Sequence, residues 1–71
     1  MSSLLRPREL QVLQRMAKGM TNRRIGEDLR ISEDTVKTHA HRLYQRLCAN
    51  DRAHAVALGY QHGLLTVKEA L

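Results

Sequence analysis

One helical stripe of apolar residues places the strongest constraint on how this chain can fold. Four apolar side chains recur at i, i+4, i+7 and i+11, the spacing that lines one face of an α-helix: Val36, Ala40, Leu43 and Leu47. Because the stripe is narrow, we expect the helix to bury one face and to leave the opposite face to solvent. Ser32 precedes this segment and belongs to the preferred N-cap residues, so the helix is predicted to begin just after it.

Three further segments have helical patterns with recognisable ends. The first is predicted from about Pro7 to Lys18, because proline is tolerated in a first helical turn and apolar residues follow at helical spacing. Thr21 caps a short second helix, which must end within a tight turn before Ser32. Asp51 caps the last helix, which runs to about Gln61. Glycines follow the first and last helices, where they commonly end a helix: Gly19 and Gly63.

These patterns predict an all-α domain of four helices without a repeat or a long linker. We expect the domain to span residues 5–65, with an N-terminal tail at 1–4 and a C-terminal tail at 66–71. Thr66–Glu69 has the form of a capping box, although a terminus this short is expected to fray. The chain has no Phe or Trp and only two Tyr, so the core must be aliphatic and an enzyme pocket would be hard to enclose.

The charge balance favours a polyanionic partner. Twelve Lys and Arg against seven Asp and Glu give a net charge of +5, and neutralisation of phosphates drives non-specific nucleic-acid binding. The single cysteine, Cys48, excludes an internal disulfide, suits a reducing cytosol and is expected to be a small core residue. No apolar run approaches the roughly 20 residues that span a bilayer, so we expect no membrane partner and a bacterial cytoplasmic setting.

The face of the longest helix opposite its apolar stripe is polar. Its side chains are of the kind that read base edges and hold phosphates: Asp34, Thr38, His41, Arg42 and Gln45, with Lys37 and Arg46 on the flanks. An ordinary solvated helix face is an equally good interpretation of this observation alone.

The start of the preceding helix favours the nucleic-acid interpretation. Asn22, Arg23 and Arg24 lie there beside backbone N–H groups that attract anions. Two helices joined by a tight turn, the second with an exposed polar face, form the architecture that inserts a recognition helix into the major groove.

Four segments of the chain have more specific spacings. They are Leu5–Glu9 followed by Val12-Leu13, Gly19–Asn22 followed by Ile25, Ile31–His39, and Asp51-Arg52 with the closing His62–Leu65. Through them the chain resembles the LuxR/FixJ/GerE-type helix-turn-helix domain. The resemblance implies a tetrahelical fold in which the helix after Ser32 is the recognition helix. It also implies a bacterial transcription regulator that binds two-fold related half-sites in double-stranded DNA as a dimer. We expect no cofactor and no enzyme activity.

The resemblance further implies roles for individual residues. Three match positions that contact bases in the family: Lys37, Thr38 and His41. Four match positions at or close to the phosphate backbone: Asn22, Arg23, Arg24 and Thr35. The helical wheel adds Arg42 to the predicted base contacts, and adds Gln45 and Arg46 to the predicted phosphate contacts.

Four positions depart from the usual pattern of the family. An acidic residue is usual near Arg24, and the extra cation here is expected to strengthen phosphate contact. Arg6 stands where Thr or Ser often caps the first helix, so this helix end is expected to be less well satisfied. Arg30 occupies a turn position where glycine is common, and a positive φ there would cost about 1 kcal/mol. Gly26 replaces a usual alanine, with a loss of about 1 kcal/mol of helix propensity if the position is exposed.

The last helix has apolar residues on two sides. One side carries Ala53, Val56, Ala57 and Tyr60, and the other carries Ala55, Leu58 and Gly59. One side must cover the core, and the sequence leaves open which one. The resemblance implies that this helix supplies the dimer contact, although a small apolar surface needs no partner. We take the predicted homodimer interface to be Ala53, Ala57 and Tyr60.

The sequence gives little support for a metal site or for a catalytic site. His39 and His41 lie about 200° apart around a helix and cannot chelate one ion together, so no metal site is expected. Ser32 and Thr35 have the positions of capping residues, and no acid–base pair lies in a plausible cleft. The main alternative is a protein-interaction module that binds RNA polymerase, a sigma factor or another regulator instead of DNA. A steep salt dependence of binding to unrelated DNA would separate the two.

Overall fold

The structure, a computed structural model, describes residues 4–66 of the 71-residue chain. Four α-helices follow one another in these residues: α1 (Pro7–Ala17), α2 (Asn22–Leu29), α3 (Glu33–Leu47) and α4 (Arg52–Gln61). No strand occurs between residues 4 and 66, so the all-α, four-helix prediction is confirmed. The capping box predicted at Thr66–Glu69 lies outside the described residues except for Thr66.

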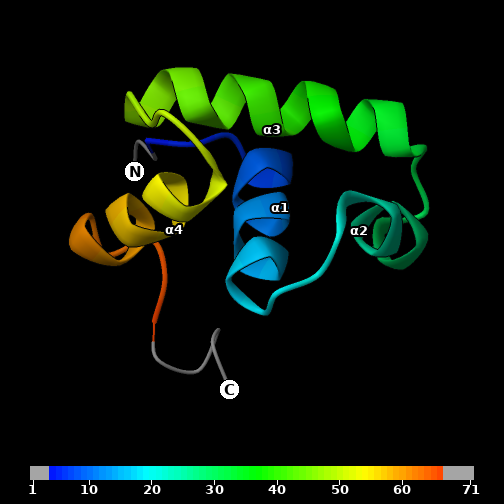
Figure 1. The fold of residues 1–71 in the computed structure, drawn as a ribbon, viewed down its shortest axis with the longest axis horizontal. Coiled ribbons are helices and arrows are strands. Elements are labelled where there is room, and N and C mark those ends of the chain that lie inside the picture. Colours follow the sequence, from blue (N-terminus) through cyan, green and yellow to red (C-terminus); the bar gives the residue numbers. More distant parts are fainter. Residues whose placement is uncertain (1–3, 67–71) are drawn as a thin grey trace.

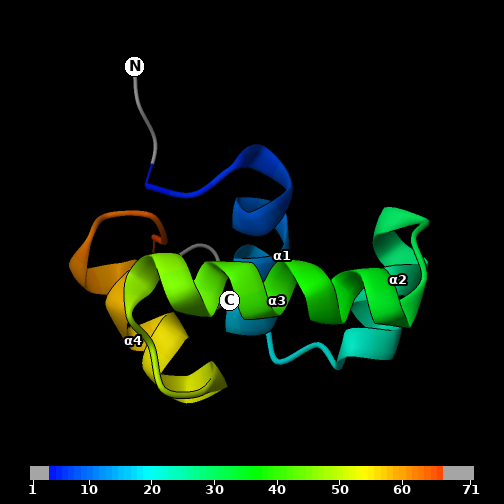
Figure 2. The same cartoon turned by 90° about the horizontal axis from the view of Figure 1, so that it is seen from above.

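α3 extends along one side of the molecule, and the other helices lie beneath it (Figure 1). α1 packs against α3 near its middle, α2 lies towards its N-terminal end and α4 towards its C-terminal end, as the second view also shows (Figure 2). α2 packs against α3 and α1, whereas α2 and α4 do not pack against each other. The outer face of α3 is therefore left uncovered by the other three helices, with the short helix α2 beside its N-terminus.

Side-chain caps begin three of the four helices at the predicted positions. In each case a side-chain oxygen accepts a hydrogen bond from the backbone N–H three residues later. The distances are 3.2 Å for Thr21 Oγ1, 3.0 Å for Ser32 Oγ and 2.8 Å for Asp51 Oδ1. Each bond satisfies an N–H group that has no partner within the helix, which explains why these residues set the helix starts.

The first helix begins differently, as its sequence indicated. Arg6 occupies the N-cap position but makes no side-chain cap, because a guanidinium group has no acceptor. Glu9 Oε1 instead accepts the backbone N–H of Arg6 at 3.1 Å, which stabilises the helix start from within the first turn.

Two helix ends place non-glycine residues in the left-handed region. Arg30 has a φ of 59° and Cys48 a φ of 57°, while Gly19 and Gly63 have positive φ as their positions predicted. Arg30 thus has the positive φ on which the expected cost of about 1 kcal/mol depends. Cys48 is exposed, so the prediction of a core cysteine is wrong. α3 ends at Leu47, and the left-handed residue that follows no longer continues the buried stripe.

The core is aliphatic and is centred on the predicted stripe of α3, all four residues of which are buried. Leu13 of α1 and Ile25 of α2 are fully buried in the same cluster, as is Ala55 of α4. Leu5 and Leu65, which bound the predicted domain, are also buried. Because every helix contributes to one small cluster, the core fixes the direction in which each helix presents its other face.

Gly26 has a packing role that its sequence position did not reveal. It is buried where α2 approaches the turn before α3, and its carbonyl accepts the Ile31 N–H at 2.9 Å. A Cβ at this position would lie 2.7 Å from the Ile31 carbonyl oxygen, closer than real Cβ contacts come. The exposed-position penalty considered from the sequence therefore does not apply, and glycine allows the close approach of two backbone segments.

Candidate nucleic-acid interface

The four residues predicted to contact bases lie together on the outer face of α3. Lys37, Thr38, His41 and Arg42 are all exposed, while the buried stripe occupies the opposite face of the same helix. Because α3 runs along the uncovered side of the molecule, this face is open along its length (Figure 1). The arrangement leaves these side chains accessible to an extended partner such as a DNA duplex.

Most of these side chains keep their polar groups available. The Thr38 hydroxyl donates to the Asp34 carbonyl at 3.2 Å, which leaves its oxygen lone pairs as acceptors. Lys37, His41 and Arg42 make no side-chain hydrogen bond or ion pair to any residue between 4 and 66. The face therefore presents donors and acceptors that the fold itself does not use.

The N-terminus of α2 carries the first group of predicted phosphate contacts. Arg23 and Arg24 are exposed, whereas Asn22 is half-buried. Arg23 forms an i,i+4 ion pair with Glu27 at 3.8 Å, but the two side chains are 81% and 59% exposed, so water and salt screen the pair. Both arginines can therefore turn to a phosphate at little cost, beside the backbone N–H groups at the start of the helix.

Thr35 and Gln45 lie at the two ends of the α3 surface. Thr35 is half-buried in the first turn, and its hydroxyl lies 2.8 Å from the Ser32 hydroxyl, next to the N-cap. Gln45 is exposed and lines a shallow surface hollow with Arg42 and Arg46. Thr35 therefore lies at the edge of the exposed face, whereas Gln45 lies on that face near the C-terminal end of α3.

The Arg46 side chain forms an ion pair within the protein. Its Nε lies 2.8 Å from Glu9 Oε1, and the carboxylate of Glu9 is buried, with only 2% of the side chain exposed. Glu9 is the one charged residue that is buried between residues 4 and 66. The Arg46 guanidinium thus neutralises a buried charge and joins α3 to α1, a role that the wheel could not show.

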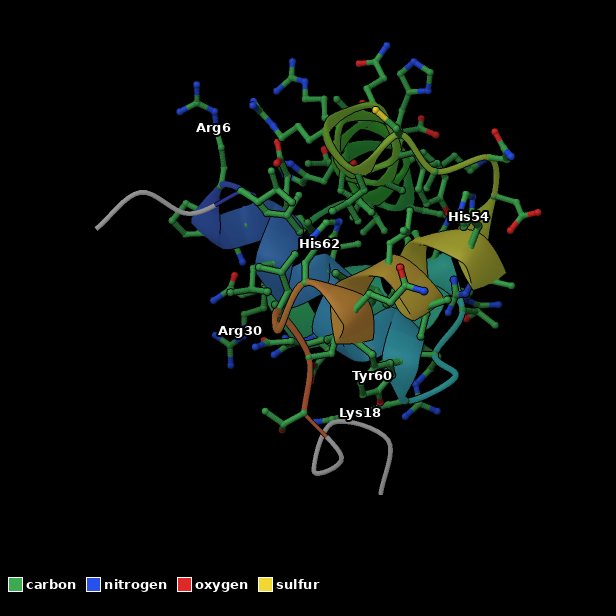
Figure 3. The ribbon with its side chains drawn as sticks, turned by 90° about the vertical axis from the view of Figure 1, so that its left-hand side faces the viewer. Arg6, Lys18, Arg30, His54, Tyr60 and His62 are labelled. Carbon is green, nitrogen blue, oxygen red and sulfur yellow. The ribbon has the colours of Figure 1, made fainter. Side chains whose placement is uncertain are left out.

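The structure also decides which side of α4 faces inward. Ala55 and Gly59 are buried, whereas Ala53, Ala57 and Tyr60 are exposed. Figure 3 shows Tyr60 on the side of α4 that faces away from α3. The predicted interface residues therefore form an exposed, largely apolar surface on α4, remote from the polar face of α3.

Arg52 is a residue that sequence analysis did not single out for a role. It is the first residue of α4, and its guanidinium donates to the Met20 carbonyl and lies 3.5 Å from Asn22 Oδ1. Burial raises the pKa of Tyr44 above 10.0, and the positive charge of the nearby Arg52 opposes this with a smaller effect. The partners of Arg52 lie about 30 positions away, so no local pattern could have identified them.

Two further findings concern the described residues only. No group of three or more His, Cys, Asp or Glu side chains between residues 4 and 66 could hold a metal ion. In the same part of the chain, no helix has both the length and the apolar character needed to cross a bilayer.

Comparison with known proteins adds an independent observation. Residues 3–58 match the model of a family described as bacterial regulatory proteins, luxR family. The chain is 50% identical over 58 residues to the uncharacterized transcriptional regulatory protein YxjL of Bacillus subtilis (strain 168), covering 82% of this chain and 27% of that protein. It is 45% identical over 65 residues to the transcriptional regulatory protein DegU of Brevibacillus brevis, covering 92% and 28%.

A third relative is the probable transcriptional regulatory protein NarL of Mycobacterium tuberculosis (strain ATCC 25618 / H37Rv). The identity is 44% over 62 residues, which cover 87% of this chain and 29% of the relative. The chain thus spans less than a third of the length of these relatives.

Proposed function

This chain belongs to the luxR family of bacterial regulatory proteins, and we propose that it binds double-stranded DNA and regulates transcription. The observation that carries the proposal is the uncovered polar face of α3, whose central side chains have almost no partner within residues 4–66. A helix of this kind fits the major groove, where each base pair presents a distinct pattern of donors and acceptors. The names of these three relatives, each a transcriptional regulatory protein, support the same function.

On this proposal α3 is the recognition helix and α2 positions it. Base edges are contacted by Lys37, Thr38, His41 and Arg42. Phosphates are contacted by Asn22, Arg23, Arg24, Thr35 and Gln45. We leave Arg46 out of the phosphate set, because its guanidinium compensates the buried charge of Glu9.

We also propose that two copies of the chain pair through α4. The exposed surface of Ala53, Ala57 and Tyr60 is apolar, and its small side chains permit close approach of a symmetric partner. A two-fold dimer places two recognition helices on related half-sites, so the DNA target is expected to be an inverted repeat. RNA polymerase is a further partner that a transcription regulator of this kind could contact.

The decisive experiment is selection of bound sequences from random duplex DNA, followed by affinity measurements over a series of salt concentrations. We expect recovery of a motif with two inverted half-sites. Thr38→Ala and His41→Ala should each change the preferred sequence, with a loss of about 1–3 kcal/mol per good base contact. Arg23→Ala should weaken binding to every duplex about equally and flatten the log–log salt slope by about one unit.

Each outcome bears on a different part of the proposal. Loss of sequence preference in Arg23→Ala but not in Thr38→Ala would mean that the orientation on DNA is wrong. A single, unrepeated half-site would contradict the dimer. No binding to any duplex even at low salt would overturn DNA binding and favour the protein-interaction module, for which polymerase subunits are the first partners to test.

A further inference from the structure

The side chain of Arg52 connects two helices that do not otherwise pack. α2 and α4 make no backbone approach to each other. Arg52, at the start of α4, nevertheless donates to the Met20 carbonyl and reaches within 3.5 Å of Asn22 Oδ1. Figure 2 shows the first turn of α4 on the same side of the molecule as the connection between α1 and α2. One guanidinium thus holds both sides of Thr21, the residue that caps α2.

The chemistry of this contact fixes the orientation of the Asn22 amide. A guanidinium group has five N–H donors and no acceptor, so only the oxygen end of a neighbouring amide can face it. With Oδ1 towards Arg52, the Nδ2 hydrogens of Asn22 are directed elsewhere and remain available to donate. Asn22 is half-buried, and its amide has no other hydrogen bond within residues 4–66.

The opposite end of α2 is held by other contacts. Arg15 of α1 forms an ion pair with Asp28 at 2.5 Å, near the C-terminus of α2. The close approach of Gly26 to Ile31 fixes the same end against the turn before α3. Arg52 contacts the N-terminal end from another helix, and this is the end proposed to meet phosphate.

We propose that Arg52 is a positioning residue for DNA binding: it sets the N-terminus of α2 and turns the Nδ2 donors of Asn22 towards the phosphate backbone. The proposal rests on the proposed function. It also gives α4, the proposed dimer helix, a direct connection to a phosphate-binding element. A change in the position of α4 would be transmitted to α2 through two hydrogen bonds of one side chain.

The test compares Arg52→Met, Arg52→Lys, Asn22→Ala and the double variant Arg52→Met/Asn22→Ala with the parent chain. Arg8→Met serves as the charge-matched control, because Arg8 is exposed and bonds only to Gln11 in its own helix. The affinity for one random-sequence duplex is measured over several salt concentrations, after circular dichroism has established that each variant is folded.

We expect Arg52→Met and Asn22→Ala each to lower the affinity roughly 3- to 10-fold, the effect of one ordinary hydrogen bond. The double variant should lose little more than either single variant, because both remove the same contact. Arg52→Lys should not restore the affinity, since one ammonium group cannot reproduce the planar fork. The salt slope should stay that of the parent chain, because Arg52 touches no phosphate. Arg8→Met should change the affinity less than about twofold.

Several results would overturn the proposal. Parental affinity in folded Arg52→Met, additive losses in the double variant, or full recovery in Arg52→Lys would each remove the positioning role. A slope flattened by about one unit in Arg52→Met would make Arg52 itself a phosphate contact. If Arg52→Met does not fold, Asn22→Ala and Arg52→Lys still decide the matter. Failure of the parent chain to bind any duplex would overturn the proposed function together with this inference, whereas the other results leave DNA binding intact.

Discussion

Replacement of Arg46 by alanine should lower the free energy of unfolding without weakening DNA binding by the folded domain. The reason lies in Glu9, whose carboxylate is buried. It forms an ion pair with Arg46, with 2.8 Å between Arg46 Nε and Glu9 Oε1, and accepts a hydrogen bond from the Arg6 backbone N–H at 3.1 Å. Arg46→Ala removes the neutralising charge and leaves the carboxylate in the interior with a single donor.

The size of the effect follows from the burial of the two partners. Removal of one partner from a fully buried ion pair costs about 3–5 kcal/mol. The Arg46 side chain is 38% exposed, so water can enter the space it leaves, and we expect a smaller loss of about 2–3 kcal/mol. A domain of this length has a free energy of unfolding of about 4–10 kcal/mol. The melting temperature should therefore fall by about 10–20 °C.

The assay is urea unfolding followed by circular dichroism, with DNA affinity measured at a temperature where both proteins are folded. Arg8→Ala is the control, since an exposed arginine bonded within its own helix should change the free energy of unfolding by less than about 0.5 kcal/mol. The double variant Glu9→Leu/Arg46→Met should recover most of the loss, because it removes both charges together.

The opposite pattern would refute this reasoning. An unchanged free energy of unfolding in Arg46→Ala, together with weaker DNA binding and a salt slope flattened by about one unit, would make Arg46 a phosphate contact. The helical-wheel prediction would then be right, and the contact with Glu9 would be energetically unimportant.

Three further predictions concern single positions. Arg30→Gly should raise the free energy of unfolding by about 0.5–1 kcal/mol, because glycine adopts a φ of 59° without strain; lower stability in urea unfolding would contradict this. Gly26→Ala should lower it by about 1 kcal/mol, since the clash with the Ile31 carbonyl outweighs the gain in helix propensity; equal or higher stability would show that the backbone can relax. Burial raises the pKa of Tyr44, so in a Tyr60→Phe variant the tyrosinate absorbance should appear above pH 10.0, and a midpoint at or below that pH would contradict the burial. Because the pKa of Tyr44 is raised in the folded state, its protonated phenol contributes to the free energy of unfolding fully below pH 10.0, and this contribution is lost as the pH rises through the folded-state pKa. The resulting pH dependence of stability should disappear in Tyr44→Phe.

The helix boundaries could be predicted because their signals are local. Thr21, Ser32 and Asp51 each cap the helix they were expected to cap, and the bond involved spans three residues. The buried stripe of α3 was predictable for the same reason, since helical periodicity alone brings its residues to one face. Cys48 marks the limit of such reasoning. It follows the stripe directly, yet one left-handed residue ends the helix and leaves its side chain exposed.

The roles of Arg46 and Arg52 could not be predicted, because they depend on residues distant in the sequence. The sequence places Glu9 in the first turn of α1, but the burial of its carboxylate beside α3 depends on how the helices pack. Arg52 similarly finds its acceptors in the connection between α1 and α2. A helical wheel describes one helix at a time, and for that reason it placed Arg46 among the phosphate contacts without showing its ion pair with Glu9.

The basic composition therefore does not translate directly into a DNA-binding surface. Arg15 and Arg46 each form an ion pair with a carboxylate of another helix. Arg52 of α4 donates to neutral acceptors at the N-terminus of α2 and in the connection before it. These three cations hold the fold together. Arg24, Lys37 and Arg42 are exposed and make no ion pair within residues 4–66, so their charge is available to a polyanion. The net charge of +5 counts both groups alike, whereas the partners and burial of each cation distinguish those that connect two parts of the fold from those left open to a polyanion.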